Sequence, residues 1–202
     1  RNLYRTVCCE ARIEMEEKRS TFIGYCQPLA DEKQANAFVS GIRERYPDAT
    51  HHVYAWVIGG ERQLQKYSDD GEPQGTAGLP VLDILRKNDI EDAGLVVVRY
   101  FGGTLLGGGG LVRAYGKAAS LALEQARPVT MQLCHRFRMT VPYADVDRLR
   151  WQLEQHGFWL GKSRYGLDVE LEVGAATGRV DELLSLCTDL TAGAVLIEPD
   201  PS

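Results

Sequence analysis

The sequence predicts an α+β chain of two domains. Strand and helix patterns follow one another in a different order in the two parts of the chain, and Pro128 stands where the order changes. The length of 202 residues is enough for one large or two small domains. We therefore expect a first domain over residues 1–128 and a second over residues 129–202.

The first part combines short strand patterns with amphipathic helices. Asp31, followed three residues later by Gln34, resembles a capping box, and Pro47 stops the helix that begins there. Proline is favoured at the first position of a helix, so a helix is expected to start near Pro80. The polar stretch 59–78 is expected to be a long loop. The remaining patterns predict strands over 7–14, 21–26, 52–58 and 93–101, the first two as a hairpin, and helices over 31–46, 80–87 and 111–125.

The second part reads strand, helix, strand, strand, helix, strand. Apolar residues recur at helical spacing over 144–155 and 178–190 and at strand spacing between these segments. This β-α-β-β-α-β order is the ferredoxin-like pattern. The expected strands cover 134–141, 158–164, 167–173 and 194–198.

Composition and charge narrow the class of partner. A hydrophobic fraction of 44% and a charged fraction of 25% are those of a soluble globular protein. The net charge is −5, so the whole chain is not a general binder of polyanions. Residues 1–128 carry 16 basic and 17 acidic side chains, whereas residues 129–202 carry 7 and 11. Any contact with nucleic acid therefore needs a local patch, which we expect in the first part.

Cysteine usage points to a reducing compartment. The five cysteines form an odd number and contain no C-x-x-C spacing, which argues against a disulfide framework and against a zinc site. Reduced thiols are typical of a cytoplasmic protein, and that is the expected location. No apolar run approaches the length of about 18 residues that a transmembrane helix needs.

The glycine-rich segment from Arg99 to Tyr115 is the most unusual part of the chain. Its glycines, at 102, 103 and 107–110, follow an apolar strand pattern and precede a helix pattern. Strand, glycine turn and helix are the layout of an anion site. The segment is not a Walker loop, because Gly107 is followed by two glycines where that loop needs Lys and Ser or Thr. It also lacks the G-x-G-x-x-G spacing, because Gly107 and Gly109 lead to Val112. Ligand binding and tight packing remain equally open explanations.

A second motif, residues 68–78, is rich in acids and turn formers. Asp69, Asp70 and Glu72 could hold Mg²⁺, cap backbone amides, or pair with Arg99 and Arg113. We favour a rigid acidic turn, and no cofactor is expected beyond this weak magnesium alternative. The spacing matches no EF-hand loop.

His51 and His52 are neighbours on a predicted strand, so their side chains point to opposite faces and cannot easily share one metal. We expect one of them to face the loops and the other to pack. Neither a Ser/His/Asp nor a Cys/His pairing stands out, and Ser68 and Thr76 lack the setting of a nucleophile elbow. No catalytic residue is assigned.

The two motifs, SDDGEPQGTAGLP and VVVRYFGGTLLGGGGLVRAYG, resemble the signature of the IMPACT/YigZ family. The resemblance covers nearly the whole chain. It implies that the first domain is similar to a fold shared by a ribosomal protein domain, GHMP kinases and domain IV of elongation factor G. It also implies that the second domain is similar to domain V of that factor. Eukaryotic members carry an extra N-terminal module and dampen the kinase that senses uncharged tRNA.

This resemblance, with the flanking arginines and tyrosines, predicts a translation-associated regulatory binding protein without catalytic activity. Its partner would be RNA, the ribosome or a translation factor, with neither a membrane nor sequence-specific DNA binding expected. Arg62 and Tyr67 would extend the surface. The predicted surface residues are Lys66, Asp69, Asp70, Gly71, Glu72, Gly75, Thr76, Gly78, Arg99, Tyr100, Gly102, Gly103, Gly107, Gly108, Gly109, Gly110, Arg113 and Tyr115.

Two alternatives belong to other classes. The glycine-rich segment could bind phosphate in a magnesium-dependent nucleotide-binding protein or hydrolase. Alternatively, the acidic second domain could serve as a protein–protein interaction module. Titration with nucleotide and magnesium would test the first alternative, and removal of residues 129–202 in a pull-down would test the second.

Overall fold

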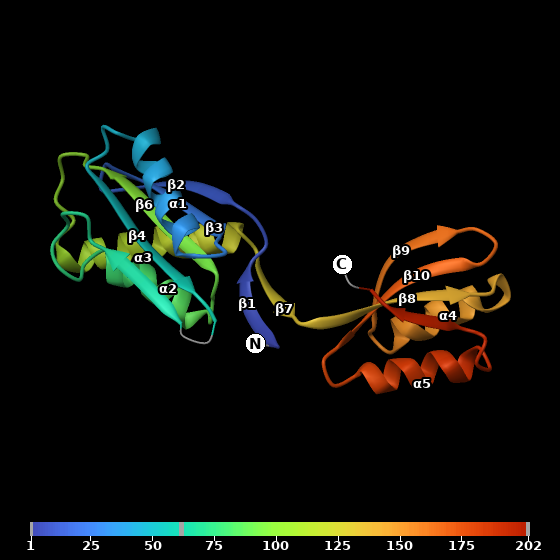
Figure 1. Cartoon of the computed structure of the whole chain (residues 1–202). Helices are drawn as coiled ribbons and strands as arrows, with labels where there is room; N and C mark the ends of the chain where they lie inside the picture. The colour runs from blue at the N-terminus through green and yellow to red at the C-terminus, as the bar shows by residue number, and fades with distance from the viewer. Residues whose placement is uncertain (1, 61–62, 201–202) are drawn as a thin grey trace. The chain divides into compact units, whose positions relative to one another are not determined.

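The computed structural model describes residues 2–60 and 63–200. It divides into two compact units, residues 3–131 and residues 132 onward, each with its own sheet and helices (Figure 1). The predicted α+β class with two domains is therefore confirmed. Among the described residues, no helix combines the length and the apolar character needed to cross a bilayer.

The first unit is built on a five-stranded antiparallel sheet in the order β2-β3-β6-β4-β5. Helices cover both of its faces, with α1 on one and α2 and α3 on the other (Figure 1). The strands are β2 (Ala11–Glu17), β3 (Ser20–Pro28), β4 (His51–Ile58), β5 (Leu64–Ser68) and β6 (Ala93–Tyr100), and the helices are α1 (Glu32–Arg45), α2 (Gly78–Lys87) and α3 (Gly108–Gln125).

Strand β6 runs through the centre of this sheet and is buried on both sides, which explains its continuous apolar run. Leu95 and Val97 pack toward α2 and α3, whereas Val96 and Val98 pack toward α1. Because side chains alternate along a strand, the next residue, Arg99, points toward α2 and α3. This alternation places Arg99 at the edge of the larger core.

Helix α1 begins and ends where its sequence predicts. The Asp31 carboxylate accepts a hydrogen bond from the Gln34 amide at 2.7 Å. The Gln34 side chain in turn accepts the Ala30 amide at 2.9 Å, so the reciprocal bond lies one residue earlier than in a standard capping box. The helix ends at Arg45, before Pro47.

Two expectations about the first unit are corrected. Residues 7–14 are not one strand, because β1 (Leu3–Val7) leaves the main sheet and pairs with β7 (Pro128–Gln132). Pro128 therefore opens a strand. Strand β5 lies within the stretch expected to be a loop. Its residues are largely exposed on an edge strand, so no alternation of apolar residues marks it in the sequence.

The second unit has the predicted order of elements. Its four-stranded sheet runs β11-β8-β10-β9, and α4 and α5 pack on one face of it (Figure 1). This is the ferredoxin-like arrangement, which confirms the prediction from the pattern. The elements are β8 (Cys134–Val141), α4 (Tyr143–Gln155), β9 (Trp159–Tyr165), β10 (Val169–Ala176), α5 (Val180–Leu190) and β11 (Leu196–Pro199).

Candidate functional site

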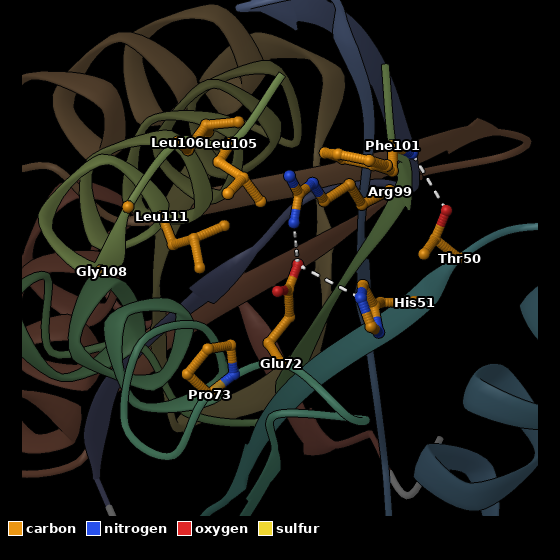
Figure 2. A pocket seen from close by; sticks show the side chains of 11 residues that line it. Thr50, His51, Glu72, Pro73, Arg99, Phe101, Leu105, Leu106, Gly108 and Leu111 are labelled. Atoms are coloured by element: carbon orange, nitrogen blue, oxygen red, sulfur yellow. Dashed lines mark hydrogen bonds and ion pairs between the residues drawn. The ribbon is translucent and has the colours of Figure 1, made fainter. Parts of the chain in front are cut away.

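The acidic motif and the glycine-rich motif meet at one pocket in the first unit (Figure 2). Its volume is about 380 Å³, within the range of small-ligand sites. It lies between the start of β4, the acidic loop, the end of β6 and the N-terminus of α3. The lining residues are Thr50, His51, Glu72, Pro73, Arg99, Phe101, Leu105, Leu106, Gly107, Gly108 and Leu111.

A buried ionic cluster of Glu72, Arg99 and Tyr115 supports this pocket. The Glu72 Oε1 atom lies 2.6 Å from Arg99 Nη1 and accepts the Tyr115 hydroxyl at 2.6 Å. His51 Nε2 lies 3.7 Å from the same oxygen. Glu72 and Arg99 are only 8% and 5% exposed, and Tyr115 is fully buried. Such charges are tolerated in the interior because they are paired.

Arg99 is held by aromatic rings as well as by Glu72. Its guanidinium carbon lies 5.6 Å from the centre of the Phe22 ring and 5.5 Å from that of Phe101. Its Nη2 atom donates to the Ser20 hydroxyl at 3.3 Å, while Nε has no hydrogen-bond partner. Burial, followed by the hydrogen bond to Glu72, raises the pKa of Tyr115. The tyrosine therefore remains a neutral donor to the carboxylate.

Asp69 holds the acidic loop in shape. Its carboxylate accepts the amides of Gly75 at 2.9 Å, Ala77 at 3.1 Å and Gly78 at 2.8 Å. The residue at the N-cap of α2, Ala77, has no side chain that could do this. Asp69 therefore caps α2 from the preceding loop, as one of the sequence alternatives anticipated.

Asp70 is directed away from the pocket. Its carboxylate contacts Arg43 Nη2 at 2.7 Å and accepts the His52 amide at 2.6 Å. Its carbonyl lies 2.8 Å from His51 Nδ1. The two histidines diverge as expected, because His51 lines the pocket and His52 Nε2 bonds to the Tyr46 carbonyl at 2.7 Å.

The three carboxylates of the loop do not converge. The Asp69 carboxylate accepts hydrogen bonds from backbone amides. That of Asp70 contacts the Arg43 side chain and the His52 amide. That of Glu72 contacts the side chains of Arg99 and Tyr115. No group of three potential metal ligands occurs among the described residues. The geometry is therefore at odds with the alternative in which these carboxylates jointly hold Mg²⁺.

The glycines of the second motif have different local reasons. Gly107 adopts a φ of +73°, a region that favours glycine. A Cβ atom on Gly102 would lie 1.8 Å from the Arg19 carbonyl, so the β2–β3 turn packs directly on it. By contrast, a Cβ on Gly108 or Gly109 would make only ordinary contacts, at 3.8 and 3.5 Å. Packing thus leaves these last two glycines unexplained.

Gly108 and Gly109 are exposed in the first turn of α3, and Gly108 lines the pocket. The first intrahelical bond that closes this turn runs from the Leu111 amide to the Gly107 carbonyl at 2.9 Å. No side chain caps the preceding amides. The helix therefore presents free donors at its N-terminus, where the helix dipole favours an anion.

The structure brings together about half of the predicted surface. Glu72, Arg99, Gly107 and Gly108 line the pocket. Five more lie directly beside lining residues or within the first turns of α3, namely Gly71, Thr76, Gly109, Gly110 and Arg113. Arg113 is exposed and makes no side-chain hydrogen bond or ion pair within the described part of the chain. Six predicted residues do not line the pocket but hold the two loops in shape, namely Asp69, Asp70, Gly75, Gly78, Gly102 and Gly103.

The last three predicted residues also do not line the pocket. Tyr115 is fully buried and supports Glu72, so it cannot contact a partner. Tyr100 points to the α1 side of the sheet, where its hydroxyl donates to Asp48 at 2.8 Å. Lys66 lies on β5 opposite Trp56, five residues along β4 from His51, which is about 16 Å at the usual rise of a strand. Arg62 is outside the described residues.

Apolar residues of the pocket were absent from the predicted surface. Leu105 is 82% exposed and Phe101 46% exposed, and both line the pocket together with Leu106, Leu111 and Pro73. The signal that could have found them is their position. Leu105 and Leu106 stand between Gly103 and Gly107, Phe101 directly precedes Gly102, and all three lie outside the helices and strands.

Fold and site together define a two-domain α+β protein with a pocket formed by an acidic and a glycine-rich motif. The chain belongs to the IMPACT family. Residues 18–123 match the Impact N-terminal domain, and residues 139–194 match a domain of unknown function, DUF1949. The first match contains both motifs and the whole pocket.

Relatives cover nearly the full chain. It is 35% identical over 190 residues to the IMPACT family member YvyE of Bacillus subtilis, covering 94% of this chain and 88% of that protein. It is 36% identical over 182 residues to the IMPACT family member YigZ of Escherichia coli, covering 89% of each. A crystal structure titled as that of a hypothetical protein is 32% identical, with a TM-score of 0.63 over 98% of this chain and 97% of that chain.

Proposed function

We propose that this chain is a non-catalytic binding protein of the translation apparatus, with the pocket as its site for single-stranded RNA. The translation link rests on membership of the IMPACT family. The resemblance given above implies for this family domains similar to those of elongation factor G and, in eukaryotic members, a role in translation control. The observation that carries the RNA site is the juxtaposition of free amides at the start of α3 with the exposed ring of Phe101, across one cavity.

The chemistry of the pocket suits one nucleotide of a flexible strand. A phosphate would accept hydrogen bonds from the amides of Gly108 and Gly109, with the Arg113 side chain close by. A base would stack on Phe101, a contact available to every base because each has a π-face. Arg99, stacked against the same ring, is neutralised by Glu72 and acts as support for the site.

Binding is expected to be weak, because the first part of the chain carries 16 basic and 17 acidic side chains and so has almost no net charge. It is expected to be sensitive to salt, because it includes a contact with phosphate. Hydrolysis gains no support from the geometry. Glu72 accepts bonds from both Arg99 and Tyr115, and the lining contains one threonine, Thr50, and neither a serine nor a cysteine. Thr50 is engaged as acceptor of the Phe101 amide at 3.0 Å.

A filter-binding titration with a ten-nucleotide RNA over a range of salt concentrations tests this proposal. Arg113→Gln should weaken binding several-fold and lower the salt dependence by about one phosphate contact. Phe101→Ala should weaken binding with little change in salt dependence. Lys66→Ala is the matched control, since it removes a cation of the same unit away from the pocket. Undetectable binding at low salt, or equal losses in all three variants, would refute the RNA site.

One observation favours a protein partner as second candidate. One wall of the pocket is apolar and partly exposed, as expected where an apolar side chain docks. It is formed by Phe101, Leu105, Leu106, Leu111 and Pro73. Co-purification from native lysate with and without RNase separates the two functions. Partners that persist after RNase and disappear with Leu105→Asp would support direct contact with a translation factor.

A further inference from the structure

Trp159, at the start of β9 in the second unit, lies on the face of the sheet opposite the helices. Along β10, Val169, Leu171 and Val173 point into the helix-covered core, so Glu170, Glu172 and Gly174 point to the open face. Gly174 is paired with Trp159 on one side and with Arg136 on the other. These three residues therefore form one row across the open face.

Two glycines make room for the indole. A Cβ atom on Gly161 would lie 2.4 Å from Cη2 of Trp159, and a Cβ on Gly174 would lie 3.1 Å from Cε3. Both glycines lie within strands, where glycine often marks the close approach of another group. Both contacted ring atoms belong to the six-membered ring of the indole, so this ring lies against the sheet surface over the two glycines.

The indole is held in place yet remains accessible. Its residue is 44% exposed, and the guanidinium carbon of Arg136 lies 5.2 Å from the ring centre. A cation at this distance is attracted to the ring and limits its rotation. A large apolar ring fixed on an open sheet, away from the core of its own unit, is suited to stacking with a planar partner.

Cationic side chains follow Trp159 on the open face, where the phosphates of a bound strand could contact them. The register shift between Leu171 and Val173 lets Lys162 follow Trp159 on the same face, next to Arg138 and Arg164. Lys162 and Arg164 have no ion pair within the described part of the chain, and they lie about 10 and 16 Å along the strand from Trp159. The spacing suits successive phosphates of an extended strand.

Acidic groups also lie on this face, and two of them are engaged. Glu172 accepts the Lys162 amide at 3.2 Å, and Asp200 lies 3.6 Å from Arg138. Glu170 stands opposite Arg164 in the register, and Glu198 stands opposite Arg138. The net field is therefore small, so stacking must provide most of the binding and the salt dependence must be shallow.

We propose that Trp159 is a stacking platform for an unpaired base of single-stranded RNA, with Arg136, Lys162 and Arg164 contacting the adjacent phosphates. This site is separate from the pocket of the first unit and does not depend on it. An aromatic peptide is the main competing occupant, but it offers no groups for the unpaired cations that follow Trp159 along β9.

The test measures fluorescence anisotropy of a labelled ten-nucleotide oligouridylate with the full chain at low salt. Trp159→Ala should weaken binding about tenfold, whereas Trp159→Phe should retain most of it. Trp151→Ala is the matched control, because Trp151 is 57% exposed on α4, outside the strands that form the open face. An abasic strand of equal length should bind the native chain as weakly as oligouridylate binds Trp159→Ala.

Native affinity in Trp159→Ala, equal losses in the two alanine variants, or equal binding of the abasic strand would overturn this proposal. So would binding of an aromatic peptide in place of RNA. Phe101→Ala in the same assay separates the two sites. Loss with Trp159→Ala alone supports the platform and refutes the pocket, and loss with Phe101→Ala alone does the reverse. Equal thermal midpoints by circular dichroism show that the variants are folded.

Discussion

Glu72 Oε1 lies 2.6 Å from Arg99 Nη1, and this ion pair joins the two motifs of the first unit. The residues are 27 positions apart, one in the acidic loop and the other at the end of the central strand β6. Because the pair is buried, each charge depends on the other. The shape of the pocket therefore depends on this buried ion pair more strongly than it would on an exposed one.

Glu72→Gln tests this dependence. The substitution leaves Arg99 buried without its counter-ion, so we expect a loss of about 3–5 kcal/mol in the free energy of unfolding, measured with urea. Glu14→Gln is the matched control, since it breaks the exposed pair with Arg12 and should cost at most about 1 kcal/mol. Equal effects of the two substitutions would contradict the buried pair.

Tyr115→Phe removes one donor from Glu72. We expect a loss of about 1–3 kcal/mol near neutral pH, because a buried carboxylate loses a hydrogen bond. Burial and Glu72 raise the pKa of Tyr115 in the folded chain. The stabilisation by its neutral hydroxyl is therefore complete below the unfolded pKa of about 10 and declines as the pH rises above it.

Urea titrations of both proteins between pH 8 and 11 measure this effect. The native chain should lose more stability than Tyr115→Phe above pH 10. Parallel curves for the two proteins would show that Tyr115 ionises equally well in the folded and unfolded states.

Asp69→Ala removes the carboxylate that caps α2. Three amides lose their acceptor, so we expect the thermal midpoint to fall and the free energy of unfolding to drop by about 2 kcal/mol. Asp83→Ala, on the exposed side of the same helix, is the control and should change stability by less than about 0.5 kcal/mol. A drop no larger than that of the control would show that the cap is dispensable.

Gly102→Ala tests the close approach of the β2–β3 turn. The added methyl would meet the Arg19 carbonyl, so we expect a loss of about 1–3 kcal/mol by urea denaturation. Gly41→Ala, in the middle of α1 with open space around it, should be neutral or stabilise the chain by up to about 1 kcal/mol. An unchanged Gly102→Ala would mean that the turn moves without cost.

The elements that could be predicted are those with a local signal. The helical periodicity of α4 and α5 and the Asp31 cap of α1 are properties of neighbouring residues, and the structure confirms them. Strand β5 could not be predicted, because it is held by pairing with β4 and buries little. The pairing of β1 with β7, which begins at Pro128, could not be predicted either, because it joins residues more than a hundred positions apart.

The candidate site shows the same division. From residue type, pairing with Arg99 was one of several alternatives for the three carboxylates of the loop, and the structure shows this contact for Glu72. Residue type could not show that Tyr115 is buried while Phe101 is exposed, since both are aromatic residues in one motif. Which of them reaches solvent is decided by the helical position of Tyr115, above the sheet, and by the loop position of Phe101.

Photo-crosslinking tests most directly whether the pocket is the RNA site of the first unit. A ten-nucleotide RNA containing 4-thiouridine is irradiated with the full chain, and tryptic peptides are analysed by mass spectrometry. Cleavage after Arg99 and Arg113 isolates residues 100–113, which contain Phe101 and the glycines of α3. We predict crosslinks on this peptide that are lost in Phe101→Ala. Crosslinks confined to other peptides of residues 1–128, or none there, would contradict the account.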